Sequence, residues 1–113
     1  MDVEKLEVYK KSREAFRKVY RICQSLPRGW GWLKDQAIRA AGSVHLNIPE
    51  GWGRPSRADR NRHFGIATAS ANEVAAAMDL VFQADLISRQ VFEEVWDDYD
   101  HITRMLGKMM VRQ

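Results

Sequence analysis

The sequence predicts an all-α protein, an antiparallel up-down-up-down four-helix bundle in which residues 1–113 form a single domain. Three observations predict this fold. The length of 113 residues suits one domain with one core. The chain has only 7 Gly and 3 Pro, too few for the many turns of a β-sandwich. Four segments carry apolar residues at intervals of three and four, and the short connections between them make successive helices antiparallel.

The first two segments are separated by residues 27–31, which contain Pro27 and two glycines. Residues 3–26 contain neither Gly nor Pro, and their apolar residues predict a helix. These residues are Leu6, Tyr9, Phe16, Val19, Tyr20, Cys23 and Leu26. A second helix begins near Trp32, and Leu33, Ala37, Ala40, Val44 and Ile48 line its predicted inner face. Pro49 predicts a kink or an early end of this helix, because proline lacks the amide and its ring clashes with the preceding turn.

Serine residues predict where the last two helices begin. Ser56, with Asp59 three residues later, resembles a capping box, and the helix that follows runs to about Ala84. Ser88 is the expected N-cap of the final helix. The predicted inner faces of these helices are Phe64, Ala67, Ala71, Val74, Met78 and Val81, and then Phe92, Val95, Tyr99, Ile102, Leu106 and Met109.

Cysteine usage and the N-terminus indicate the compartment. Cys23 is the single cysteine, so no intramolecular disulfide forms, and we expect an inert core thiol. The first residues lack the pattern of a signal peptide, and no stretch is apolar enough to span a membrane. We therefore expect a cytoplasmic protein with no membrane partner.

Charge is distributed unevenly along the chain. Residues 1–63 carry 14 Lys and Arg against 7 Asp and Glu, whereas residues 64–113 carry 4 against 8. This polarity favours either a basic face for an anionic partner or contact between the basic face of one subunit and the acidic face of another.

A basic stripe follows the first predicted helix. Lys10, Arg13, Arg17 and Arg21 recur at intervals of three and four, the spacing that lets one helix face follow a row of phosphates. The alternative is a solvated face on which Glu7 and Glu14 pair with basic residues one turn later. Both interpretations remain open, and these four residues are candidate RNA- or DNA-binding residues.

A second basic cluster lies after the second helix. Arg54, Arg57 and Arg60 stand near Trp52, and planar cations beside an aromatic ring suit phosphate binding and base stacking. A subunit interface is the alternative, because Trp and Arg are also enriched there.

Two polar residues near the inner face of the second helix need partners. We expect Asn47 to belong to a structural hydrogen-bond network. Glu50 lies near the helix C-terminus, where the dipole opposes its charge, so we expect a cationic partner from the third helix or from another subunit.

The segment from Gln36 to Gly51 resembles a known signature. Its residues Arg39-Ala40, Ser43-Val44, Asn47-Ile48 and Glu50-Gly51 are similar to the Arg-Ala-x-x-Ser-Ile-x-x-Asn-Ile-Ala-Glu-Gly pattern of proteins encoded within intervening sequences of 23S ribosomal RNA, also called S23 ribosomal proteins. Leu6-x-Val8-Tyr9-Lys10, Arg54-x-Ser56 and Ala67-x-Ala69-Ser70-x-x-Glu73 extend the resemblance. Pro49 and Ala69 replace the usual Ala and Gly.

This resemblance implies a bundle that assembles as a ring-shaped homopentamer. It also implies kinship to accessory proteins of diversity-generating retroelements, which are basic and engage nucleic acid and a reverse transcriptase. The motif positions expected to serve structure or subunit contact are Gln36, Arg39, Ser43, Asn47, Glu50, Gly51 and Glu73.

Enzymatic chemistry has little support in the sequence. Asp97, Asp98 and His101 could face one metal ion, but the Glu-x-x-His pairs of a di-iron bundle do not occur. We predict no catalytic residue, metal or cofactor. The favoured function is a non-enzymatic homopentameric scaffold whose basic surfaces bind nucleic acid, and the alternative is an assembly or adaptor protein that binds only proteins.

Overall fold

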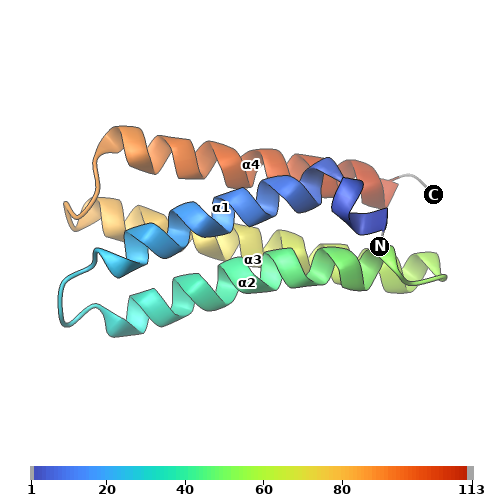
Figure 1. The fold of residues 1–113 in the computed structure, drawn as a ribbon, viewed down its shortest axis with the longest axis horizontal. Coiled ribbons are helices and arrows are strands. Elements are labelled where there is room, and N and C mark those ends of the chain that lie inside the picture. The colour runs from blue at the N-terminus through green and yellow to red at the C-terminus, as the bar shows by residue number, and fades with distance from the viewer. Residues whose placement is uncertain (1, 112–113) are drawn as a thin grey trace.

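The structure, a computed structural model, describes residues 2–111 and contains four long helices (Figure 1). A short 3₁₀ helix, η1 (Asp2–Lys5), precedes α1 (Glu7–Gln24). The chain continues through α2 (Gly31–Trp52), α3 (Arg57–Gln83) and α4 (Arg89–Val111). No strand occurs in residues 2–111, so the predicted all-α class is confirmed.

The helices occupy the corners of an elongated bundle with extents of 44 × 23 × 21 Å. Each packs against its neighbours in sequence, and α4 also packs against α1, while α1 and α3 stand at diagonal corners. The α2–α3 turn lies at the end of the bundle where the described chain begins and ends, and the other two turns lie at the opposite end (Figure 1).

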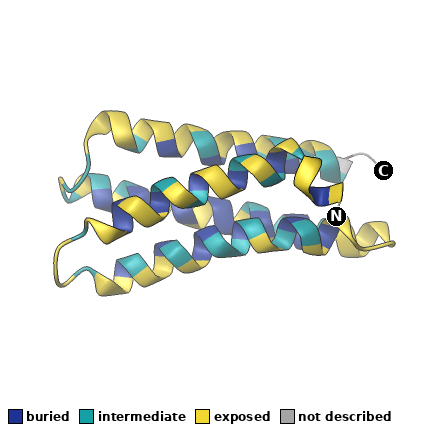
Figure 2. Cartoon of the chain, in the orientation of Figure 1, coloured by how far each residue is buried: buried dark blue, intermediate teal, exposed yellow. Residues whose placement is uncertain are grey.

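The buried residues form one core between the four helices (Figure 2). Every predicted inner residue of α2 and α3 is buried, because three-four spacing keeps these side chains on one face. In α4, Val95, Tyr99, Ile102 and Leu106 are buried, while Phe92 and Met109 are partly buried. In α1, Val19 and Cys23 are buried, whereas Tyr20 is exposed.

The first helix begins later than predicted. Leu6 has extended backbone, with φ −71° and ψ 131°, and so separates η1 from α1. Its amide donates to the Val3 carbonyl at 3.0 Å, and Val3 is buried. The separate turn therefore lets an apolar side chain near the start of the chain reach the core.

Pro49 does not end α2 early, contrary to one of our two expectations. The helix continues to Trp52, and the Gly53 amide donates to the Pro49 carbonyl at 3.0 Å. Pro49 lacks the amide that would donate to the His45 carbonyl, so α2 forgoes that hydrogen bond and continues for about one further turn. The predicted caps are present: Ser56 Oγ accepts from the Asp59 amide and Ser88 Oγ from the Val91 amide, each at 3.1 Å.

Gly51 lies at a tight contact between α2 and α3. It is buried, and a Cβ atom built on it would lie 2.6 Å from Cε1 of Phe64 and 3.1 Å from Cβ of His63. Phe64 is itself in the core. Glycine is therefore required here for close packing of the two helices rather than for backbone freedom.

We predict that Gly51→Ala destabilises the protein by about 1–3 kcal/mol, because the added methyl group forces Phe64 out of a filled core. Urea unfolding followed by circular dichroism measures the change. Gly107→Ala is the matched control, since a Cβ there meets nothing within 4 Å; it should raise stability by up to about 1 kcal/mol. Equal effects of the two substitutions would contradict this account of Gly51.

Candidate functional site

Lysines on α1 bind the neighbouring helix α4. Lys11 Nζ donates to Asp98 Oδ1 at 3.2 Å, and Lys18 Nζ lies 2.8 Å from both Asp98 Oδ2 and Glu94 Oε1. The hydrogen bonds to Asp98 and Glu94 raise the pKa of Lys18 above its ordinary value. These lysines therefore hold α1 against α4.

The arginines of the predicted basic stripe face solvent. Within the described chain, no carboxylate lies within 4 Å of the guanidinium groups of Arg13, Arg17 and Arg21. Lys10 pairs with Glu7 at 3.7 Å, three residues away. The pairing expected at intervals of four along α1 is thus not seen, and three permanently charged groups are left on one helix.

The cluster after α2 is partly engaged in local contacts. Arg54 Nη2 lies 3.1 Å from Glu50 Oε2. Arg60 Nε donates to the Arg54 carbonyl at 3.0 Å, and its guanidinium lies 5.9 Å from the centre of the Trp52 ring. Arg57 is exposed and makes no ion pair with residues 2–111. The expectation that Glu50 needs a partner from the third helix or another subunit was wrong, because Arg54 reaches back one turn from the loop.

A chain of hydrogen bonds joins α2 to α3. Asn47 Nδ2 donates to the Ser43 carbonyl at 2.9 Å, which leaves Asn47 Oδ1 as the acceptor for His63 Nδ1 at 3.0 Å. Nε2 of His63 faces Arg62 Nη2 at 3.2 Å, a donor. His63 thus connects Asn47 of α2 with Arg62 through its two ring nitrogens. Ser70 Oγ donates to Ser43 Oγ at 2.8 Å and extends the network.

The outer face shared by α2 and α3 carries unusual apolar residues for a surface. Trp32, Arg39 and Leu46 are seven residues apart on α2, and Ile66, Glu73 and Leu80 are seven apart on α3. We call these six residues the ridge. Trp32 is 62% exposed and Leu46 64% exposed. Gln36 Nε2 donates to Glu73 Oε2 near the middle of the ridge, so these two motif residues join α2 to α3, and Arg39 lies one turn of α2 from Gln36.

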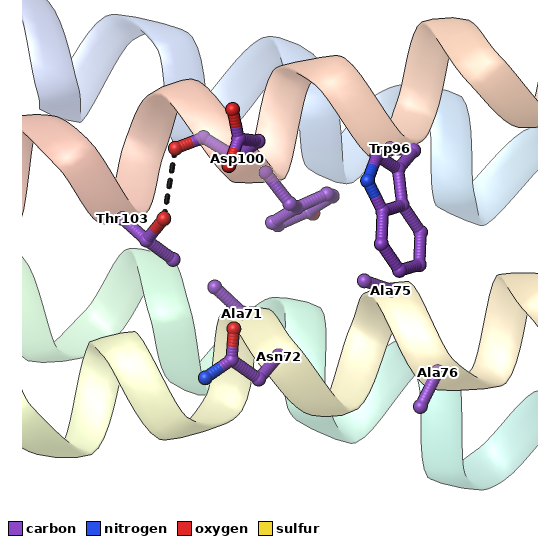
Figure 3. A pocket seen from close by; sticks show the side chains of 8 residues that line it. Ala71, Asn72, Ala75, Ala76, Trp96, Asp100 and Thr103 are labelled. Atoms are coloured by element: carbon purple, nitrogen blue, oxygen red, sulfur yellow. Dashed lines mark hydrogen bonds between the residues drawn. The ribbon is translucent and has the colours of Figure 1, made fainter.

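A cavity of about 210 Å³ lies between α3 and α4 (Figure 3). Its α3 side consists of Ala71, Asn72, Ala75 and Ala76. Trp96, Tyr99, Asp100 and Thr103 form its α4 side. In Figure 3 the Trp96 indole projects from α4 towards Ala75. The small alanine side chains leave this space open, and a shallower hollow lined by Asp79, Phe92, Glu93, Trp96 and Asp97 adjoins it at Trp96.

Residues that could support other functions have structural roles. Asp98 binds Lys11 and Lys18, and residues 2–111 contain no group of three His, Cys, Asp or Glu side chains placed to hold a metal. Cys23 is buried as predicted, and burial raises the pKa of its thiol. None of the described helices is long and apolar enough to cross a membrane.

One contact between α1 and α2 was not predicted from the sequence. Ser12 Oγ lies 2.7 Å from His45 Nδ1 and also donates to the Tyr9 carbonyl at 2.9 Å. The His45 ring packs on Tyr9 with ring centres 4.3 Å apart. Burial, and then the charge of Arg13, lower the pKa of His45 below its ordinary value of 6.5.

This lowered pKa predicts acid sensitivity. Between the folded and unfolded pKa values of His45 the unfolded chain binds more protons, so its contribution to stability is complete above pH 6.5 and falls as the pH drops below that value. Urea unfolding at about pH 7.5 and pH 5.5 measures the loss. His45→Gln should lose less stability on acidification than the wild type, and an identical loss in both proteins would refute the role of His45.

Comparisons with known proteins agree with this architecture. The family model of the 23S rRNA-intervening sequence protein matches residues 4–108. A solved structure of a protein of unknown function from the S23 ribosomal protein family of Bacteroides thetaiotaomicron has a TM-score of 0.84 and 25% identity, over 92% of this chain and 98% of that chain. No curated protein matches the sequence. The family match extends over most of the chain, so this protein belongs to the 23S rRNA-intervening sequence protein family.

Proposed function

We propose that this protein is a non-enzymatic, homopentameric scaffold that binds nucleic acid along α1. The observation that carries the proposal is the row of Arg13, Arg17 and Arg21, three guanidinium groups on an exposed helix face without a carboxylate partner in the described chain. Cations in a row that are not neutralised by carboxylates attract phosphates and release counterions on binding.

The arginine row differs from the lysines that flank it. Lys11 and Lys18 already bind carboxylates of α4. The arginines keep fork-shaped donors that match phosphate oxygens, and such contacts need no particular base sequence. We therefore expect binding that depends on charge rather than on sequence.

The ridge supports self-assembly. Several large apolar side chains exposed on one face, here Trp32, Leu46, Ile66 and Leu80, mark a contact surface. Assembly would also repeat the arginine row around a symmetry axis, so that weak contacts of single copies add up on one long strand.

The first prediction concerns mass. A pentamer of the 13.1 kDa chain has a mass of about 65 kDa. Light scattering across micromolar concentrations should give this value. A mass of one or two chains over that range would rule out the pentamer.

The second prediction concerns nucleic acid. Arg17→Glu with Arg21→Glu should weaken binding to single-stranded RNA, because each substitution removes a cation that neutralises a phosphate. The plot of log affinity against log salt should become shallower by about 0.7–0.9 for each arginine–phosphate pair removed. Fluorescence anisotropy at low and moderate salt measures both effects.

A second double variant separates the two basic surfaces. Arg57→Glu with Arg60→Glu changes the cluster beside Trp52, and each variant is first checked for unchanged mass and helicity. If the wild type binds neither RNA nor DNA at low salt, or if both double variants bind as the wild type does, the protein-only adaptor is the correct function.

A further inference from the structure

We propose that the ridge of one copy docks on the α3–α4 face of a second copy, with Arg39 against Asp97 and Asp100 of that copy. The receiving surface is the cavity beside Trp96 together with the adjoining hollow, which we call the groove. The proposal rests on the self-assembly proposed above and names the two surfaces that meet.

The two surfaces lie on adjacent sides of the bundle. The ridge belongs to the α2–α3 side and the groove to the α3–α4 side, and the two sides share α3. Contacts between different surfaces of identical copies build a ring when the rotation closes and a filament when it does not. Adjacent sides of a four-helix bundle meet at roughly a right angle, and the rotation of about 72° between copies of a five-membered ring lies within about 20° of this value, whereas opposite sides would extend a filament.

A ring whose axis is parallel to the bundle keeps every residue at its own height, so only residues at the same level can meet. The Gln36–Glu73 hydrogen bond places this part of α2 level with Glu73 on α3. The cavity brings Asn72, beside Glu73, level with Asp100 and Thr103 on α4 (Figure 3). The hydrogen bond between the short side chains of Ser43 and Ser70 places these two residues level with each other. Arg39 lies one turn before Ser43 on α2, which on the antiparallel α3 is the level of Glu73, and it is therefore at the level of the Asp97–Asp100 turn of α4.

Charge supports this pairing. Arg39 is exposed and has no carboxylate partner within residues 2–111. Asp97 likewise forms no ion pair in the described chain, and Asp100 pairs with Arg104 at 2.9 Å but is itself exposed. A guanidinium group can bind both carboxylates through its separate donors. At the same level, Asn72 of the groove offers a side-chain amide to Glu73 of the ridge.

Apolar contacts would surround this ion pair. Trp96 in the groove is 45% exposed beside the open space left by Ala75 and Ala76. The ridge offers Trp32 on one side of Arg39 and Leu46 on the other. The centre of a stable interface commonly has a large apolar side chain that fills a hollow of the partner, next to a paired charge.

This pairing also places α1. Because the ridge and groove share α3, that helix faces the ring axis. The diagonal helix α1 then faces outward, with Arg13, Arg17 and Arg21 exposed in every copy. Assembly and nucleic-acid binding therefore use separate surfaces.

A charge exchange tests the pairing. Arg39→Glu alone, and Asp97→Arg with Asp100→Arg, should each lower the mass measured by light scattering to that of smaller species, because like charges then face each other. We expect the dissociation constant of the contact to rise about tenfold or more. The triple variant, which combines all three changes in one chain, should recover the wild-type mass.

Two further variants serve as controls. Arg17→Glu reverses a charge of the same kind on α1 and should leave the mass unchanged. Glu73→Arg combined with Arg39→Glu tests a two-fold contact between two ridges, in which Arg39 would meet Glu73 of the other copy. Circular dichroism checks that every variant retains its helices.

The outcomes separate the pairing from the proposed function. A monomeric wild type would overturn self-assembly itself. If the wild type is oligomeric and both the Arg39→Glu variant and the Asp97→Arg, Asp100→Arg variant keep its mass, only the ridge–groove pairing is overturned. Rescue of Arg39→Glu by Glu73→Arg, without rescue by the Asp97 and Asp100 reversals, would replace it with the two-fold contact.

Discussion

The tight packing of α2 against α3 is the constraint on which the other features depend. The missing side chain of Gly51 lets Phe64 and His63 approach α2. Hydrogen bonds from His63 to Asn47 Oδ1 and from Ser70 to Ser43 Oγ then fix the axial position of one helix along the other. A change in this axial position would separate Gln36 from Glu73. The motif residues thus hold α2 and α3 in register. They thereby determine which exposed residues of α2 lie beside which exposed residues of α3.

The apolar spacing was sufficient to predict the helices and most of the core. Residues that recur every three or four positions share one face of a helix, and in α2 and α3 that apolar face is buried in the bundle interior. The ends of helices were less predictable. Leu6 interrupts the first helix so that Val3 can be buried, and α2 runs past Pro49 to Trp52, where Gly51 packs against Phe64 of α3. Both outcomes depend on tertiary contacts that a local pattern does not contain.

The positions of the charged residues along the helices could be predicted from the sequence, but their pairings could not. The sequence places Glu7 and Glu14 near the basic stripe, yet the folded chain pairs Lys11 and Lys18 with α4 instead. Those carboxylates are some 80 residues away along the chain and become neighbours only when the bundle closes. The same holds for Ser12 and His45, for which only proximity in the fold reveals a contact. The seven-residue spacing of Trp32, Arg39 and Leu46 could have predicted the ridge from the sequence, because residues seven apart share a helix face and this face lies outside the predicted core face.

The uneven charge of the chain has a structural explanation. The acidic helix α4 has two sides: Asp98 and Glu94 face α1 and bind its lysines, whereas Asp97 and Asp100 lie on the outer surface towards α3. The first pair neutralises the lysines of α1 that face α4, and the arginines of α1 remain on its solvent-facing side. The second side remains acidic, next to an exposed tryptophan. The acidic helix α4 therefore has two effects. On one side its carboxylates orient α1 so that the arginines of α1 face solvent, and on the other side its carboxylates present a surface suited to a cation.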